Sequence, residues 1–151
     1  MSSVSKINIQ SYALAGETLP KLYKILLIGE IKMAIGKKDW IIPDCELPPE
    51  GEGVLKGHES VICVNDTDKV AKIKVTLYFA DKDAYEGIEW IVEPKRVKCF
   101  RMNVPEHMSG YVVPLETQYA MKLESSQKIV VQYGRLDNRQ TNLAYYTTMA
   151  Y

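Results

Sequence analysis

The sequence is poor in the residue types from which metal centres are built. It has 151 residues, of which three are cysteine and two are histidine. Cys45, Cys63 and Cys99 lie far apart, without a CxxC pair or a Cys/His cluster, so we expect neither structural zinc nor another cofactor. A chain of this length buries enough surface to fold without disulfides, and its cysteine usage favours a reducing, cytoplasmic compartment.

The chain also lacks an excess of charge and any long hydrophobic run. Lys plus Arg and Asp plus Glu number 19 each, giving a formal net charge of zero. A neutral chain has no long-range field to attract phosphate backbones, so nucleic acid is not expected as the principal partner. The longest apolar run near the N-terminus, residues 25–28, is far shorter than the ~20 residues of a membrane helix, so no membrane insertion is expected.

Signatures of catalysis are equally scarce. No GxGxxG or GxxxxGK pattern occurs, and neither His58 nor His107 lies in a nucleophile motif. The sequence therefore predicts a protein that is not an enzyme. The remaining enzymatic alternative is an activity on sugars with Asp137 and Glu59 as acid and base.

The residue pattern divides the chain into an N-terminal extension, residues 1–32, and one domain, residues 33–151. The apolar fraction of 46% and the charged fraction of 25% are those of an ordinary globular protein. The extension has mixed patterning that fits either a short amphipathic helix or a strand at a sheet edge. Met33 is also a candidate start of translation, which would place the extension outside the protein.

From residue 35 onward, apolar and polar residues alternate with a period of two. This alternation predicts half-buried strands, at residues 59–64, 71–79, 88–92, 97–102, 119–123, 129–131 and 143–151. Ser125-Ser126-Gln127 is expected to separate two of them. About 7–8 short strands with turns between them predict an all-β fold, an antiparallel β-sandwich. Cys63 and Cys99 lie in apolar strand patterns and are expected in the core.

A polar cluster directly follows the strand at residues 129–131. It consists of Gln132, Arg135, Asp137 and Arg139. Guanidinium groups and carboxylates make the paired hydrogen bonds that a polyhydroxylated or anionic small molecule requires. The alternative is an Arg–Asp pair that satisfies itself and only fixes a turn or a subunit contact.

Three blocks give the chain a resemblance to a known family. They are residues 58–65 (HESVICVN), 72–82 (KIKVTLYFADK) and 130–140 (VVQYGRLDNRQ), with Trp40 before them and Met149-Ala150-Tyr151 after them. Together they resemble the sensory rhodopsin transducer family. The resemblance implies a small β-sandwich that forms a cyclic homotetramer and has a pocket for sugars or related small molecules. The namesake member is the soluble partner of a photoreceptor, a role that most relatives lack.

With this resemblance, further residues become candidates for ligand binding. Trp40 is a candidate to stack on a sugar ring, although Trp is more often core. His58 and Glu59 are adjacent at a strand start and point to opposite faces of the sheet; a strand-end histidine bonded to a backbone carbonyl is the alternative for His58. Arg101 is a candidate to reach the same end of the sheet as Arg135.

These observations predict a sensor domain that binds a sugar-like or anionic small molecule. Ten tyrosines offer amphipathic surface suited to subunit contacts. The alternative is a signalling adaptor that binds a protein or DNA partner.

Overall fold

The computed structural model describes residues 35–140 and 142–151. Among these residues, every extended element is a β-strand, and the one helical element is a short 3-10 helix, η1. The elements in chain order are β1 (Lys37–Glu46), β2 (His58–Asn65), β3 (Ala71–Phe79), β4 (Tyr85–Val92), β5 (Arg96–Arg101), η1 (Pro105–Met108), β6 (Gln118–Asp137) and β7 (Ala144–Met149). The predicted all-β fold with about seven strands is confirmed, while the expected extension, residues 1–32, lies outside the described residues.

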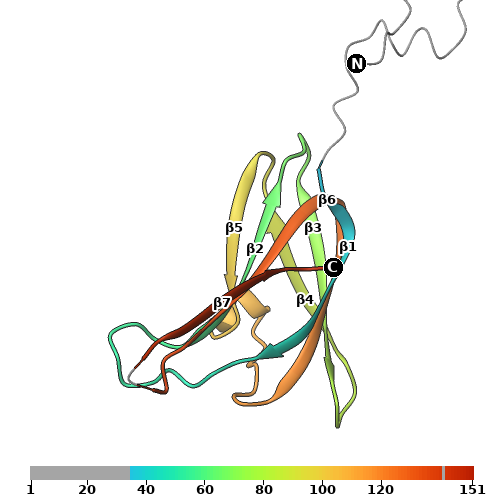
Figure 1. The fold of residues 1–151 in the computed structure, drawn as a ribbon. Helices are drawn as coiled ribbons and strands as arrows, with labels where there is room; N and C mark the ends of the chain where they lie inside the picture. The colour runs from blue at the N-terminus through green and yellow to red at the C-terminus, as the bar shows by residue number, and fades with distance from the viewer. Residues whose placement is uncertain (1–34, 141) are drawn as a thin grey trace, which may run out of the picture. The chain divides into compact units, whose positions relative to one another are not determined.

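Strand β6 holds the sheet together, because each half of it pairs with different neighbours. Its first half pairs with β1 on one side and β3 on the other. Its second half pairs with β2 and β7. Since β4 extends β3 and β5 extends β2, one antiparallel sheet results, with the order β4-β3-β6-β2-β5. The sheet curls into a half-barrel (Figure 1). We call the two parts the β1 half (β4, β3, β1 and the start of β6) and the β7 half (β5, β2, β7 and the end of β6).

The sequence predicted two strands where the structure has the single strand β6. Ser125 and Ser126 were expected to end the first of them, but both serines remain in the strand. Their hydroxyls accept backbone hydrogen bonds, Ser125 from Gln127 at 3.3 Å and Ser126 from Lys72 at 3.0 Å. The serines therefore mark the place where β6 exchanges one set of neighbours for another.

The inner face of the curled sheet carries the core, to which both halves contribute. Core residues come from every strand up to β6. β4 and β5, at opposite ends of the strand order, meet across this core because the rings of Trp90 and Phe100 stack at 4.1 Å. The indole N–H of Trp90 also donates to the carbonyl of His107 in η1, at 2.6 Å. Side-chain packing thus closes the curl where the backbone does not.

The outer faces of the two halves differ in chemistry. On the β1 half the outward side chains are largely charged, for example Lys72, Lys74, Glu89, Lys122 and Glu124. On the β7 half they are largely apolar: Val97 and Cys99 of β5, Ile62 and Val64 of β2, Val130 and Leu136 of β6, and Tyr145 and Met149 of β7. We call this second set the apolar outer face. The prediction that Cys99 is a core residue is wrong, because Cys99 lies on this face and is exposed.

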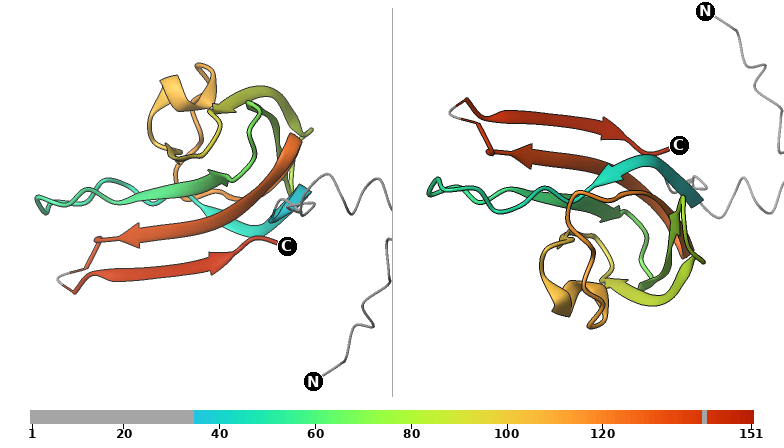
Figure 2. Two further views of the ribbon diagram at one scale, coloured as in Figure 1. Left: turned by 90° about the horizontal axis from the view of Figure 1, so that it is seen from above. Right: turned by 90° about the horizontal axis from the view of Figure 1, so that it is seen from below.

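Two connections lie side by side at one end of the sheet (Figure 2). One is the 47–57 loop, and the other joins β6 to β7. The amide of Asn138 donates to the carbonyl of Leu55, and the amide N–H of Gly57 donates to Glu50 at 2.8 Å. A side chain at Gly51, where φ is +68°, would collide with Asn138, so only glycine permits this approach. No helix in the described part of the chain has the length and hydropathy to cross a bilayer.

Candidate functional site

The inner face of β6 carries a ladder of polar side chains toward the end of the strand. Tyr133, Arg135 and Asp137 alternate along β6 and therefore share one face. Glu59 of β2 is directly opposite Arg135, and Tyr146 of β7 flanks Arg135 on the other side. Three neighbouring strands thus bring these groups together.

Glu59 is completely buried, with 0% of its surface exposed. Its carboxyl group accepts hydrogen bonds from the hydroxyls of Tyr119, at 2.6 Å, and Tyr133. The backbone N–H of Glu46 donates to the same group, also at 2.6 Å. Three donors satisfy a carboxyl group that has lost all contact with water, which makes its burial tolerable.

Burial raises the pKa of the Glu59 carboxyl above its ordinary value, because the charged form loses its hydration. The hydrogen bonds from Tyr119, Tyr133 and the backbone of Glu46 oppose this shift. Burial likewise raises the pKa of the Cys45 thiol, and the neighbouring Glu59 adds to that shift. The interior at this point therefore disfavours negative charge.

Glu46, the last residue of β1, links the buried and exposed parts of the ladder. Its N–H binds Glu59, its carbonyl accepts from the guanidinium of Arg135 at 3.4 Å, and its carboxylate lies 3.9 Å from Arg139. One residue at a strand end thus contacts three of the residues predicted from the sequence.

Asp137 and Arg139 form a tight ion pair at the exposed end of the ladder. The Nε–H of Arg139 donates to Asp137 at 2.9 Å, and its Nη2 does so at 2.5 Å. Nη1 donates to Glu116 at 2.9 Å. The hydrogen bond from Arg139 lowers the pKa of Asp137 below its ordinary value. Three carboxylates, those of Asp137, Glu116 and Glu46, thus surround one guanidinium.

A cavity of about 480 Å³ opens beside this ion pair, between the two connections at the end of the sheet. It is lined by Pro49, Gly51, Glu52, Gly53, Asn138, Arg139, Gln140 and Leu143. Its volume lies within the range of small-molecule pockets. Arg139, whose side chain is 40% exposed, supplies guanidinium N–H groups at this place.

Four predicted site residues lie elsewhere. Gln132, His58 and Arg101 belong to the outer face of the β7 half, opposite the ladder. His58 Nδ1 is 2.8 Å from the carbonyl of Lys56. This is the contact expected if His58 is a strand-end histidine bonded to a backbone carbonyl. Trp40 is buried in the core and donates to the carbonyl of Lys37 at 3.1 Å. The structure therefore brings together Glu59, Arg135, Asp137 and Arg139, but not the whole predicted set.

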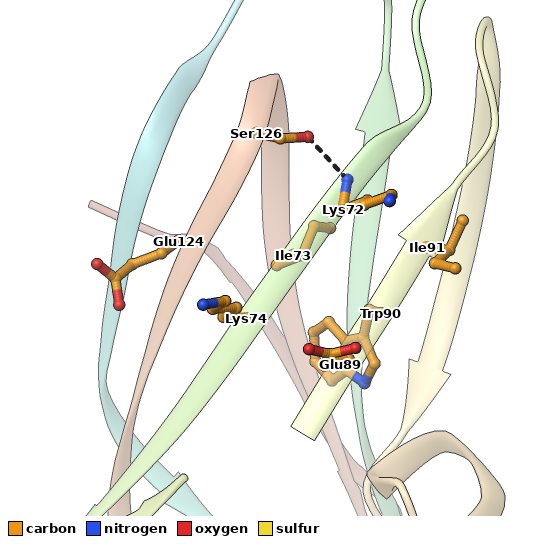
Figure 3. Close-up of a pocket in the computed structure, with 8 residues that line it drawn as sticks. All are labelled: Lys72, Ile73, Lys74, Glu89, Trp90, Ile91, Glu124 and Ser126. Atoms are coloured by element: carbon orange, nitrogen blue, oxygen red, sulfur yellow. Dashed lines mark hydrogen bonds between the residues drawn. The ribbon is translucent and has the colours of Figure 1, made fainter. Parts of the chain in front are cut away.

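A second cavity, of about 410 Å³, lies on the β1 half and contains none of the predicted residues. Figure 3 shows its lining, in which the hydroxyl of Ser126 accepts from the backbone N–H of Lys72. Lys74 is the register partner of both Glu89 and Glu124 there, so this part of the lining carries charges of both signs. Within the described residues, no group of three or more His, Cys, Asp or Glu side chains could hold a metal ion.

Comparisons with known proteins decide the family. The family model described as "Anabaena sensory rhodopsin transducer" matches residues 35–151. The chain belongs to the sensory rhodopsin transducer family. The crystal structure of Thermotoga maritima 1070 is similar over 77% of this chain and 94% of that one, with 28% identity and a TM-score of 0.68. The structure of the Anabaena sensory rhodopsin transducer is similar over 68% of this chain and 99% of that one, with 30% identity and a TM-score of 0.60. No curated protein matches the chain.

Sequence reasoning missed four residues around the site of this transducer-family chain: Glu46, Tyr119, Tyr133 and Tyr146. Tyr119 and Tyr133 bind a partner that is 60 and 74 positions away in the sequence. The one available signal was spacing, because Tyr133, Arg135 and Asp137 are two residues apart along one strand and therefore share a face. By the same spacing, Gln132 lies on the other face.

Proposed function

We propose that this transducer-family chain is a sensor domain that binds a small hydroxylated molecule without chemically changing it. The observation that carries the proposal is the cavity of about 480 Å³ beside the Asp137–Arg139 pair. Guanidinium N–H groups and carboxylate oxygens offer both donors and acceptors to neighbouring hydroxyls. The family resemblance, with its implied sugar pocket, supports the same class of ligand.

The charges around Arg139 favour a neutral ligand over an anionic one. One guanidinium is flanked by the carboxylates of Asp137, Glu116 and Glu46, so the local charge is negative. A ligand carboxylate or phosphate would be repelled, whereas the hydroxyls of a neutral sugar can donate to these oxygens. We therefore expect neutral sugars to bind more tightly than the corresponding sugar acids.

Thermal and calorimetric titration with matched neutral sugars and sugar acids tests the proposal. A ligand at ten times its Kd should stabilise the protein by about 1.4 kcal/mol. Arg139→Gln should abolish that stabilisation. Arg96→Gln should retain it, because the exposed Arg96 on β5 does not line the cavity and its guanidinium donates to the neighbouring Lys95 carbonyl.

Three results would count against the proposal: no stabilisation by any sugar at millimolar concentrations, equal binding by Arg139→Gln, or turnover of a bound sugar. The last would favour the enzymatic alternative. NMR spectra of the sugar before and after incubation distinguish binding from turnover.

We further propose that the chain assembles as a homotetramer through the apolar outer face. Val64 and Met149 are 38% and 47% exposed on this face, and all six residues of β7 are exposed. A largely apolar exposed face of this kind marks a protein contact more often than free surface. Val64→Lys should therefore dissociate the assembly in light scattering and native mass spectrometry. Ile91→Lys, a similar change on the outer face of the β1 half, should leave the assembly intact.

A signalling protein is the second candidate occupant of the apolar outer face, and the same measurement separates the two. A wild-type chain that remains monomeric at high concentration would rule out the homotetramer and leave the face available to a different protein.

A further inference from the structure

Glu59 is an ionisable group that lies outside the proposed ligand site. It lies inside the curled sheet, completely buried, and the cavity beside Arg139 does not reach it. The residues after it on the same face of β2, Val61 and Cys63, are core residues. A carboxyl group at the head of an apolar row is costly unless the site has been built for it.

The hydrogen bonds around Glu59 can serve both protonation states. An ionised carboxylate can accept from Tyr119, Tyr133 and the N–H of Glu46, all of which lie within hydrogen-bond distance. A protonated carboxyl group can instead donate to one tyrosine hydroxyl, because a hydroxyl accepts as well as donates. A change of protonation therefore requires the rotation of a hydroxyl rather than a rearrangement of the core.

Charged and titratable groups face Glu59 from three strands. β1 contributes Cys45 and the N–H of Glu46, β6 contributes Tyr119, Tyr133 and Arg135, and β7 contributes Tyr146, which packs against Tyr133 and Arg135. Asp44 of β1 is exposed and acts on Cys45 and Arg135. Arg135 is the only cation in this set. Among the described residues, it does not form an ion pair with Glu59, although the two are register partners.

Arg135 is held by two contacts, neither of which is with Glu59 itself. Its guanidinium donates to the carbonyl of Glu46 at 3.4 Å and lies over the ring of Tyr146, with 5.1 Å between the guanidinium carbon and the ring centre. Neither contact is strong, since 3.4 Å is long for a hydrogen bond and an exposed cation–π contact is worth less than a buried one. A buried negative charge on the register partner would attract this guanidinium more strongly.

We propose that Glu59 is a proton-controlled switch: when its proton passes to solvent, Arg135 moves inward toward the carboxylate, leaves Tyr146, and loosens strand β7 on β6. The strand is suited to such a response, because all its side chains are exposed and β6 is its only pairing neighbour among the described strands. Beyond the strand the chain is anchored, because Ala150 is buried and Tyr151 exchanges backbone hydrogen bonds with Ile41 at 2.8 and 3.0 Å. Within residues 144–149, Tyr146 supplies the aromatic contact to β6, so losing it has a measurable effect there.

The switch would make the apolar outer face sensitive to pH, since Tyr145 and Met149 of β7 belong to that face. A protonated Glu59 keeps β7 docked, and an ionised Glu59 releases it. The switch should act above the pH at which an exposed glutamate loses its proton, because burial raises the pKa of Glu59.

NMR titration of the full chain tests the switch. The side-chain carboxyl carbon of Glu59 and the backbone amides of residues 144–149 are followed over a broad pH range. We expect both to titrate with one common midpoint, above the ordinary glutamate value of about 4.3. Glu59→Gln should abolish the titration of the β7 amides and hold them near their low-pH shifts.

Glu124→Gln is the matched control, since Glu124 is an exposed carboxylate on the outer face of β6, paired with Lys122. It should leave the β7 titration unchanged. The proposal is overturned if the Glu59 carbon titrates at or below the ordinary value, if the β7 amides do not follow it, or if they still titrate in Glu59→Gln. Should Glu59→Gln fail to fold, Arg135→Gln takes its place: Glu59 should still titrate, while the β7 response is lost.

Discussion

The hydroxyl of Tyr119 offers the most direct test of the buried carboxyl cluster. Tyr119→Phe removes one donor to Glu59 and changes nothing else in shape, at a position that is itself buried. A hydrogen bond to a charged group contributes about 1.5–3 kcal/mol, and a neutral one about 0.5–1.5 kcal/mol. The loss should therefore cost about 2 kcal/mol where Glu59 is ionised and about 1 kcal/mol where it is protonated.

The sign of the pH dependence follows from the raised pKa of Glu59. The folded state holds this proton more tightly than the unfolded chain does, so the contribution of Glu59 to stability is complete below the unfolded pKa. That contribution is lost as the pH rises through the folded pKa. Tyr119→Phe should steepen the loss, because the ionised form then has one donor fewer.

Urea unfolding at a series of pH values measures both effects. Tyr78→Phe is the control: its hydroxyl lies on the outer face of β3, and the change should cost no more than about 0.5 kcal/mol. In a Glu59→Gln background, the pH dependence of the Tyr119→Phe effect should disappear. An equal cost at every pH, or an unchanged pH dependence in the Glu59→Gln background, would refute the reasoning.

Three further outcomes are expected. The ion pair with Arg139 lowers the pKa of Asp137, so wild-type stability should fall as the pH drops through the folded pKa, below the ordinary aspartate value. Asp137→Asn should lose less stability than wild type over this pH range in unfolding experiments. Gly57→Ala should destabilise the protein by about 1–3 kcal/mol, because its methyl group would collide with the backbone carbonyl of Pro49 in the same loop. Gly53→Ala, which meets only ordinary contacts, should be neutral or slightly stabilising by calorimetry. Leu123→Ala should cost about 2–5 kcal/mol in urea unfolding, since Leu123 is completely buried, and a cost below about 1 kcal/mol would contradict its place in the core.

Alternation in the sequence was sufficient for the strands and for most of the core. The pattern at residues 71–79 predicted β3 and its buried face, and the residues confirmed there include Ile73, Val75 and Leu77. Alternation alone could not say which apolar face is closed, because β5 carries apolar residues on both faces. Cys99 was therefore predicted to lie in the core. In the structure Cys99 is exposed, and its neighbour Phe100 is the core residue of β5.

The candidate site was predictable only as far as its residues follow one another along one strand. The sequence singled out Arg135, Asp137 and Arg139 because they follow a core strand. In the structure Arg139 forms an ion pair with Asp137. Their role in ligand binding stays a prediction. Gln132 was grouped with them by distance along the chain, although strand geometry turns it to the opposite face.

The amino-acid sequence by itself determined the all-β fold and the polar end of β6, because both depend on neighbours within a few residues. Only the tertiary structure decided that Glu59 is buried beneath Tyr119 and Tyr133, and that Glu46 joins it to Arg135. These contacts depend on the curl of the sheet, which brings the end of β1 and both halves of β6 around the start of β2. Such a closure is set by packing among all the strands, so no local pattern records it.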